Sequence, residues 1–411
     1  MPRTQTAIVG AGQAGLALSR HLTDAGHDHV LLERGRIGER WRSERWDSLV
    51  LLTPNWLNVL PGSPAHDDPD GFLAREELVA YLDAYARSIG APVEEGVSVE
   101  AVERVGSGFR VDTDRGTWLA ANVVVATGDS AEPHEPPAAA AAPAGLVQLH
   151  SRGYRSPGAL PDGGVLVVGA GASGQQIALE LARAGRQVVL AVGRHARMPR
   201  RYRGRDIWFW LDAIGNLDES IDEVPSPREA RRAPSLAITG ANGGEELNLG
   251  RLSDLGVVVC GRLRGFDGQR AVFADDRELH VATSDERLRH LLARIDEHIT
   301  DALGPHAPEP DTVPQLSLPA CPGTADLRAE GIATVIWATG YRRSYPWLRL
   351  PVFDGDGEIV QRRGVTPMDG VFVLGLRFQH RRRSHFIGGV GEDAAFLAEL
   401  LAGSLAARRA A

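Results

Sequence analysis

Two glycine-rich loops are the segments of this sequence best suited to do chemistry. The first, Gly10-Ala11-Gly12-Gln13-Ala14-Gly15, follows the apolar run 6–9, and the second, Gly169-Ala170-Gly171-Ala172-Ser173-Gly174, follows the apolar run 164–168. In such a loop the first glycine permits a tight turn, the second lets the backbone approach a pyrophosphate, and the third lets the next helix pack against the strand. The free N–H groups at the start of that helix attract phosphates. Each loop therefore predicts a dinucleotide site.

The residue at the end of the following strand differs between the two sites. Glu33 ends the second strand of the first unit, where a carboxylate accepts hydrogen bonds from ribose hydroxyls. The equivalent position of the second unit is Val192, and Arg194 follows shortly after it. A carboxylate would repel a 2′-phosphate, whereas a guanidinium can bind it through two hydrogen bonds. The first site is therefore predicted to hold FAD and the second NADPH. Arg200 and Arg201 are interpreted either as further phosphate ligands or as ordinary surface arginines.

The elements that must position these loops recur along the chain as strand, loop, helix and strand. They span 6–32 and 164–192, and further helices are predicted over Arg75–Ser88, over Glu286–Leu303 and from Asp393 to Ala407. This pattern predicts an α/β protein with two Rossmann-like dinucleotide-binding domains (the FAD/NAD(P)-binding fold), the NADPH domain being inserted in a discontinuous FAD domain. The predicted boundaries are 1–155 and 310–411 for the FAD domain and 160–305 for the NADPH domain, with an Arg- and Trp-rich insert near 197–250.

Composition argues against several classes of function. The net charge is -8, so the chain lacks the basic excess that would bind a nucleic acid. It contains no lysine, which removes Schiff-base chemistry. Cys260 and Cys321 stand far apart without a C-x-x-C motif, so we expect no dithiol relay, no metal site and no secreted disulfide framework. No leader and no bilayer-spanning apolar run are recognised, and a cytoplasmic protein without a membrane partner is expected.

Several short motifs resemble those of class B flavin-dependent monooxygenases of the flavin-containing monooxygenase (FMO) type. They are the two glycine loops, Val125-Ala126-Thr127-Gly128, Trp337-Ala338-Thr339-Gly340-Tyr341, and His150-Ser151 with Tyr154. The resemblance covers nearly the whole chain. Ala144 and Leu146 depart from it, because the family has phenylalanine and glycine there, and related Baeyer–Villiger enzymes have tryptophan where Tyr154 stands. His150 is interpreted either as a catalytic residue or as a loop histidine packed between the domains.

The resemblance implies FAD, NADPH and dioxygen as reactants and a small organic molecule as substrate. NADPH reduces the flavin, and dioxygen then forms a C4a-hydroperoxyflavin that oxygenates a nitrogen, sulfur or carbon atom. The protein has to position the rings and exclude water. In this family the two Ala-Thr-Gly segments mark the linkers between the nucleotide domains, which places Thr127, Gly128, Thr339, Gly340 and Tyr341 near the cofactors. A homodimer is compatible with the resemblance, which does not specify an oligomeric state.

Asn55 is the catalytic candidate. In related enzymes an asparagine in the corresponding stretch lies near flavin C4a, where Asn55 would donate a hydrogen bond to the peroxide; alternatively it caps a turn after Pro54. The segment 38–41 resembles the family's G-G-x-W segment, and glycines before the last helix would let N–H groups approach the flavin. The other predicted cofactor contacts are Gln13, Ala14, Arg34, Arg40, Trp41, Thr53, Gly389 and Gly391 for FAD, and Ser173 and Gln175 for NADPH.

Trp208 and Trp210 form an unusual aromatic cluster. They either line a substrate pocket or pack in the core, and the run Arg381–Arg383 is either a solvated loop or a binding site for anions. Two other functions stay open on the same fold. One is a Baeyer–Villiger or oxidative decarboxylation reaction, against the first of which Tyr154 weighs. The other is an NADPH-dependent flavoprotein reductase without a redox disulfide.

Overall fold

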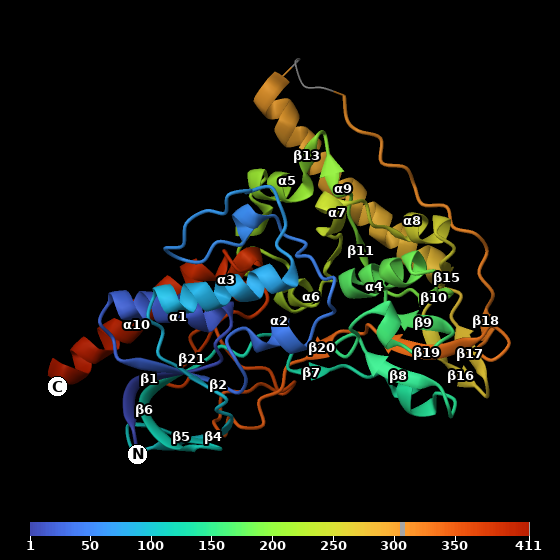
Figure 1. Cartoon of the computed structure of the whole chain (residues 1–411). Coiled ribbons are helices and arrows are strands. Elements are labelled where there is room, and N and C mark those ends of the chain that lie inside the picture. The colour runs from blue at the N-terminus through green and yellow to red at the C-terminus, as the bar shows by residue number, and fades with distance from the viewer. Residues whose placement is uncertain (305–308, 411) are drawn as a thin grey trace.

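The computed structural model describes residues 1–304 and 309–410, with side chains up to residue 403. It contains two α/β domains that lie side by side, and both ends of the chain belong to the first of them (Figure 1). Each domain is built on a mainly parallel sheet whose strands are apolar and buried. The predicted fold class, two Rossmann-like domains with one inserted in the other, is confirmed. In the described ranges no helix is long and apolar enough to cross a membrane.

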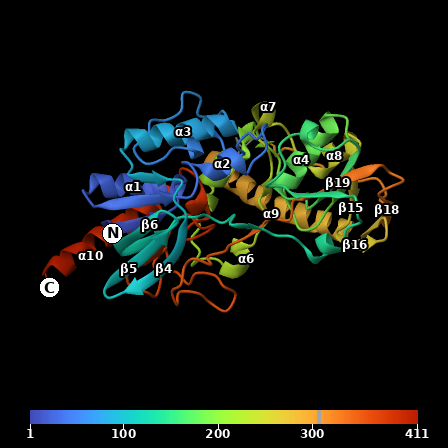
Figure 2. The ribbon, with the colours of Figure 1, turned by 60° about the horizontal axis from the view of Figure 1, so that its bottom comes forward.

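The first sheet has seven strands in the order β3-β2-β1-β6-β5-β4, with β21 also paired to β6. Strands β3, β2, β1, the end of β6 and β21 run parallel, while β4, β5 and β6 form an antiparallel meander. Helices α1, α3 and α10 cover one face (Figure 2). The elements are β1 (Arg3–Val9), α1 (Gln13–Asp24), β2 (His29–Glu33), α2 (Glu39–Ser43), η1 (Asn55–Leu57), α3 (Arg75–Ser88), β3 (Val93–Glu95), β4 (Val99–Val105), β5 (Gly108–Thr113), β6 (Gly116–Val125), β21 (Val371–Val373), η6 (Arg382–His385) and α10 (Val390–Ala410).

The second sheet has five parallel strands in the order β15-β10-β9-β19-β8. A small antiparallel sheet of β16, β17 and β18 lies beside it. The elements are η2 (Pro137–Ala141), β8 (Val147–His150), η3 (Pro157–Ala159), β9 (Gly164–Val168), α4 (Ala172–Arg183), β10 (Val188–Ala191), α8 (Leu249–Asp254), β15 (Val258–Cys260), β16 (Leu263–Asp267), β17 (Arg270–Phe273), α9 (Arg277–Leu303), β18 (Thr324–Asp326) and β19 (Ile332–Trp337).

The pairing of β8 and β19 with the second sheet corrects both predicted domain boundaries. The chain leaves the first domain after β6, and it returns after β19 rather than at residue 310. The two crossings, β7 (Glu132–Pro133) and β20 (Tyr341–Arg342), pair with each other as antiparallel strands. The boundaries were misplaced because the sequence of a short strand such as β8 does not indicate which sheet the strand will join. The predicted end of the second domain at residue 305 lies outside the described residues.

The insert near 197–250 consists of short elements, as expected, but it packs against both domains. Ile221 N donates to His380 O at 2.7 Å, and Arg382 N donates to Glu219 O at 3.2 Å. The run Arg381–Arg383 forms ion pairs with acidic residues of the insert. It is therefore a docking surface rather than a solvated loop. The elements are β11 (Ala196–Arg197), β12 (Arg201–Tyr202), β13 (Arg205–Asp206), α5 (Ile207–Ala213), η4 (Asn216–Asp218), α6 (Pro227–Arg231), β14 (Leu236–Ala237) and α7 (Ala241–Gly244).

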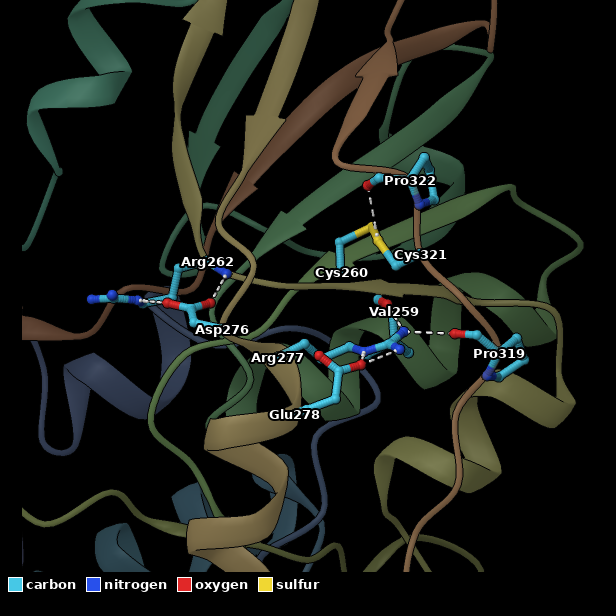
Figure 3. Close-up of a disulfide and its surroundings, with 9 residues drawn as sticks. All are labelled: Val259, Cys260, Arg262, Asp276, Arg277, Glu278, Pro319, Cys321 and Pro322. Carbon is cyan, nitrogen blue, oxygen red and sulfur yellow. Dashed lines mark hydrogen bonds and ion pairs between the residues drawn. A yellow bond between two sulfur atoms is a disulfide. The ribbon is translucent and has the colours of Figure 1, made fainter.

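The two cysteines form a disulfide, which the sequence interpretation did not anticipate. Cys260 ends β15, and Cys321 lies in the segment that leads to β18, with their Cα atoms 5.4 Å apart (Figure 3). The separation of 61 residues along the chain is closed because residues 309–323 run back along the edge of the second sheet. Distance in sequence was a poor guide to distance in space.

Candidate active site

The two glycine loops have nearly the same backbone. Gly10 and Gly169 both adopt a φ of 109°, which a residue with a Cβ rarely takes. A Cβ on Gly10 would lie only 2.7 Å from Ala126 O, and one on Gly169 would overlap Ala338 O. These carbonyls belong to the two Ala-Thr-Gly segments. Each segment thus forms the wall against which its glycine loop turns.

The other glycines of the loops show that both sites fit a dinucleotide. A Cβ on Gly15 would overlap Gly10 O, and one on Gly174 would overlap Gly169 O, so helix and strand pack as closely as the motif predicts. By contrast, nothing lies within 4 Å of a Cβ placed on Gly12 or Gly171. These two residues are the N-caps of α1 and α4, and no side chain caps either helix. Open space beside unpaired helix N–H groups suits a pyrophosphate.

Glu33 lies directly against the first loop. Its Oε2 accepts from Ala11 N at 2.9 Å and its Oε1 from Gly35 N at 3.0 Å. A pocket of about 570 Å³ adjoins these groups at the carboxyl ends of β2 and β3. In a Rossmann unit this is where the adenosine ribose lies. The pocket is lined by Arg34, Gly35, Arg36, Glu39, Ser43, Glu44, Glu95, Gly96 and Arg152.

Glu44 is a functional candidate that the sequence interpretation missed. Its side chain is buried and pairs with Arg34 at 3.2 Å, Arg40 at 3.4 Å and Arg152 at 2.5 Å. One carboxylate therefore gathers three guanidinium groups beside the first site and leaves them an excess of positive charge. Arg34 and Arg40 were predicted from short-range motifs. Arg152 comes from the second domain, and only the fold brings it here.

In the second site, Arg194 follows the end of β10, and its contact with a 2′-phosphate stays a prediction. Val192 N donates to Cys260 O at 2.9 Å, which fixes the end of β10 against β15. The Arg194 side chain is exposed and forms no hydrogen bond or ion pair within the part of the chain that the structure describes. Its guanidinium is free to bind an anion. Gln175 is buried and its Nε2 donates to Ala170 O at 2.9 Å, so it supports the loop from behind.

Arg200, by contrast, does not lie where it could bind a phosphate, so this part of the prediction is wrong. Its side chain is 2% exposed and pairs with Asp206 at 2.5 Å, while Nη1 donates to Leu52 O at 2.8 Å and to Thr239 O at 3.3 Å. Phe72 lies over the same guanidinium, 4.3 Å from ring centroid to Cζ. Because its side chain is buried and four of its five N–H groups are used in this way, Arg200 joins the insert to the first domain and is not exposed to a nucleotide.

The interdomain linkers carry a stack of side chains. Arg45 lies 5.4 Å from the ring of Trp41 and 5.9 Å from that of Tyr341, which meets His150 edge-on at 4.9 Å. His150 Nε2 lies 2.9 Å from Gly340 O, and its Nδ1 accepts from Arg152 N at 3.1 Å. Both ring nitrogens are therefore occupied, and burial lowers the pKa of His150. These contacts favour the interpretation of His150 as a residue packed between the domains.

The two threonines of the Ala-Thr-Gly segments differ in their contacts. Thr339 Oγ1 donates to His134 O and so ties the returning linker to the outgoing one. Thr127 Oγ1 is buried without a partner beside the first glycine loop. A buried hydroxyl normally has a hydrogen-bond partner. Thr127 is thus placed to meet a bound cofactor, whereas Thr339 holds the linker.

The segment with Asn55 forms one wall between the domains and the insert. Trp208 Nε1 donates to Leu52 O at 2.8 Å, and the Trp208 ring meets Phe386 edge-on at 5.3 Å. Gly388 N donates to Leu57 O at 2.9 Å, so the start of α10 packs against the same wall. Trp210 lies farther out, and its Nε1 donates to Tyr202 O at 2.7 Å. Trp208 is buried in the core beside this wall, and Trp210 packs at its edge, where it is only partly buried.

Asn55 itself is almost completely buried. Its Nδ2 donates to Asp68 O at 2.9 Å, while its Oδ1 has no partner. Thr53 Oγ1 donates to the neighbouring Asn58 Oδ1 at 2.8 Å. The structure anchors the Asn55 amide to the loop above it and leaves one of its polar atoms unpaired. Its catalytic role stays a prediction.

The short helix η6, which precedes α10, ends with a residue that the motifs did not reveal. His385 precedes Phe386, its Nδ1 is buried without a partner, and burial lowers its pKa to about 4. It is therefore neutral at physiological pH. A Cβ on Gly389 would overlap Arg383 O, and one on Gly391 would lie 2.9 Å from Pro61 Cγ, so these glycines are needed for close packing. No pattern around His385 separated it from an ordinary loop histidine.

Known proteins with the same arrangement identify the family. A family model described as pyridine nucleotide-disulphide oxidoreductase matches residues 7–213. The chain belongs to this family. An uncharacterized CzcO-like oxidoreductase from Geobacillus kaustophilus is 31% identical over 393 residues, which cover 95% of this chain and 96% of the relative. The indole-3-pyruvate monooxygenase YUCCA1 of Oryza sativa is 34% identical over 189 residues, or 45% of this chain and 47% of that enzyme.

Solved structures of similar fold include a flavin monooxygenase and a disulfide reductase. The flavin-containing monooxygenase from Stenotrophomonas maltophilia gives a TM-score of 0.67 at 20% identity, covering 98% of this chain and 100% of that one. The bacillithiol disulfide reductase from Staphylococcus aureus gives 0.60 at 12% identity, covering 98% and 99%. The predicted FMO resemblance is confirmed, and the chain is an FAD-dependent oxidoreductase that uses NADPH.

The disulfide of this family member does not lie where electrons from a flavin would reach it directly. Cys260 belongs to β15, the strand at one edge of the second sheet, and β8 at the opposite edge leads to the linkers. The domains meet near β7 and β20, on the far side of that sheet from β15 (Figure 1). The disulfide therefore lies at the outer edge of the second domain, away from the boundary between the domains.

Proposed function

We propose that this oxidoreductase is an NADPH- and dioxygen-dependent flavin monooxygenase that oxygenates a small organic molecule. The position of the two cysteines carries the proposal. Both lie at the outer edge of the second domain, so a flavin held between the domains has no thiol pair beside it. An internal dithiol relay is thereby excluded, and dioxygen is the acceptor that we propose. The monooxygenase relatives support the same conclusion, and the indole-3-pyruvate named for the rice enzyme makes a small organic acid one candidate substrate.

The chain's own residues bind and orient the cofactors. The first glycine loop and the N-terminus of α1 would hold the pyrophosphate of FAD, and Glu33 would accept hydrogen bonds from its ribose. The second loop and Arg194 would hold NADPH. When bound, FAD accepts a hydride from NADPH and passes electrons to dioxygen.

The wall of 52–57 and 386–389 would exclude water and orient a substrate. Phe386 and Leu52, which pack against the buried Trp208, supply apolar surface there, and Asn55 supplies an amide. An amide fixed at one end by Asp68 O costs little reorganisation when it meets a polar group of the reacting species. We therefore assign to Asn55 the protection of the oxygen-derived species, either directly or through a water molecule.

Rapid mixing of the NADPH-reduced holoenzyme with oxygenated buffer tests the proposal. The account predicts a transient absorbance that matches neither reduced nor oxidised flavin and outlives the reoxidation of free reduced flavin. Reoxidation in one step, with all the oxygen recovered as hydrogen peroxide, would leave a flavoprotein reductase as the function. The disulfide reductase of similar fold makes that second function worth measuring with a disulfide substrate in the same assay.

A pair of matched substitutions assigns the role of the amide. Asn55→Ser should shorten the lifetime of the transient about tenfold, the scale of one lost hydrogen bond in a dry site. Asn248→Ser is the control, because Asn248 caps α8 in the second domain and serine preserves that cap. Equal lifetimes in the two variants would remove Asn55 from the reaction and leave it as the residue that anchors its turn.

A further inference from the structure

The Cys260–Cys321 disulfide is attached to the backbone that recognises the second nucleotide. Cys260 is the last residue of β15 and pairs in register with Ala191 of β10. Its carbonyl accepts the hydrogen bond from Val192 N at 2.9 Å. Val192 occupies the position that Glu33 has in the first domain, and Arg194 follows it. One half of the disulfide is thus bonded to the strand end that would read the phosphorylated adenosine.

The other half fixes a strap, residues 309–323, that runs along this edge of the second domain. Besides the disulfide, several hydrogen bonds hold it, among them those from Arg203 N to the Asp311 carboxylate and from Phe273 N to Gly323 O at 2.9 Å. Arg277 Nη1 donates to Pro319 O at 2.7 Å and to Val259 O at 2.8 Å, and so ties the strap to β15 a second time (Figure 3). Arg197 Nη2 donates to Pro314 O at 2.8 Å, and Leu316 N donates to Asp285 Oδ2 at 3.4 Å. The disulfide is the covalent member of this set.

A second guanidinium group, that of Arg262, lies just after Cys260 in the loop that follows β15. Arg262 N and Nε bind Asp276, at 3.0 and 2.5 Å, and 63% of the Arg262 side chain is exposed. Its Cγ would lie 3.3 Å from a Cβ placed on Gly193, the neighbour of Arg194. The loop after β15 therefore brings the Arg262 side chain against Gly193, the residue before Arg194. Two guanidinium groups at the ends of neighbouring strands form a surface that suits a phosphate monoester.

We propose that Cys260 and Cys321 form a reversible thiol–disulfide site that sets the affinity of the second domain for the 2′-phosphate of NADPH. With the disulfide closed, the end of β15 and the Arg262 loop are held against β10. With it open, the strap keeps only its hydrogen bonds, and the Arg262 loop is less firmly held against Gly193 and Arg194. Preorganisation of the binding groups is lost, and NADPH binds more weakly.

Simple reagents can both form and break this disulfide. Hydrogen peroxide closes it: two thiols lose two protons and two electrons, one S–S bond forms, and the O–O bond breaks to give two molecules of water. A dithiol opens it through a mixed disulfide, and its own sulfurs end as a disulfide while the protein regains two thiols. Cys260 is fully buried and Cys321 only partly, so the Cys321 sulfur is the one open to attack.

The test measures the affinity of the FAD-loaded, full-length protein for NADP⁺ in both redox states. Protein closed with hydrogen peroxide should bind NADP⁺ about tenfold more tightly than protein opened with dithiothreitol, a typical coupling between two sites. NAD⁺, which lacks the 2′-phosphate, should bind equally to both. Alkylation followed by mass spectrometry reports the state of the thiols in each sample.

Two variants make the result specific. Cys321→Ser should bind NADP⁺ as the opened protein does and should no longer respond to dithiothreitol. Arg262→Ala should weaken NADP⁺ in the closed protein and abolish the difference between the states. FAD content and the melting temperature are followed throughout, and the wild-type comparison needs no substitution at all. Equal NADP⁺ affinities in samples whose thiols are shown to be open and closed would overturn the proposal, as would free thiols after treatment with peroxide.

Discussion

The two glycine loops differ less in their backbones than in what surrounds their strand ends. Both begin with a glycine at a φ of 109°, both are walled by an Ala-Thr-Gly segment, and both lead into an uncapped helix. At the strand ends the first domain has Glu33 and Glu95, whereas the second has Arg194 and the disulfide. The comparison teaches that backbone geometry binds the pyrophosphate, while a few side chains at neighbouring strand ends choose the nucleotide.

Filling the open space in each loop should have the largest effect. Gly12→Val should abolish FAD retention, and Gly171→Val should abolish NADP⁺ binding while FAD stays bound. Each change places carbon atoms where the pyrophosphate would lie, and losing two charge-assisted hydrogen bonds costs about a hundredfold or more in affinity. FAD content and NADP⁺ titration of the purified variants measure both effects.

The control for these substitutions is Gly265→Val. A Cβ at Gly265 in β16 also meets nothing within 4 Å, but no nucleotide is expected there. It should leave both affinities unchanged. If Gly171→Val released FAD as readily as Gly12→Val does, the division of labour between the two loops would be wrong.

Removing the guanidinium of Arg194 should have the next largest effect. Arg194→Ala should raise the dissociation constant for NADP⁺ by about thirtyfold, the scale of one charge-assisted contact with a phosphate. NAD⁺ affinity should stay the same, because that nucleotide has no 2′-phosphate. Arg186→Ala is the matched control, since its guanidinium binds backbone carbonyls near the start of β9. An equal loss for NADP⁺ and NAD⁺ would show that Arg194 supports the fold rather than reads the phosphate.

Acid should weaken the first domain through its buried histidines. His29 Nδ1 lies 2.8 Å from His27 O, so His29 Nε2 accepts from Ser19 Oγ at 2.8 Å, and burial lowers the pKa of His29 below its usual 6.5. A lowered pKa means that the folded protein binds fewer protons than the unfolded chain. The stability that His29 contributes is therefore complete above pH 6.5 and is lost as the pH falls below that value.

Melting curves between about pH 7.5 and about pH 5.5, roughly one unit to either side of an ordinary histidine pKa, measure this loss. His29→Gln should lower stability at neutral pH but flatten its dependence on pH. His290→Gln, at an exposed position on α9, should follow the wild type. A pH dependence that is unchanged in His29→Gln would assign the acid sensitivity to other groups.

The smallest expected effect concerns the wall between the domains. Trp208→Phe keeps an aromatic ring against Phe386 but removes the hydrogen bond to Leu52 O. One such bond contributes about 1 kcal/mol, so the KM for the organic substrate should rise a few-fold while that for NADPH stays constant. Trp210→Phe loses a similar bond to Tyr202 O and should leave both constants unchanged. Equal changes in the two variants would place the substrate elsewhere.

Local patterns located the two glycine loops, whose backbones the structure shows, but long-range contacts were out of their reach. The glycine loops and the choice between Glu33 and Arg194 depend on residues close together in sequence. Arg200 is close to Arg194 in the sequence, so both were candidate phosphate ligands, but the fold buries Arg200 against Asp206 and Leu52 O. The disulfide and the convergence of Arg152 on Glu44 likewise depend on segments that meet only in three dimensions.

Anaerobic reduction of the wild-type flavin tests the division between the two sites most directly. The bleaching of the bound FAD is followed after mixing with NADPH or with NADH at equal, subsaturating concentrations. The account predicts that NADPH reduces the flavin at least about tenfold faster, because only its 2′-phosphate can use Arg194. Equal rates, or faster reduction by NADH, would contradict the assignment of the second site to NADPH.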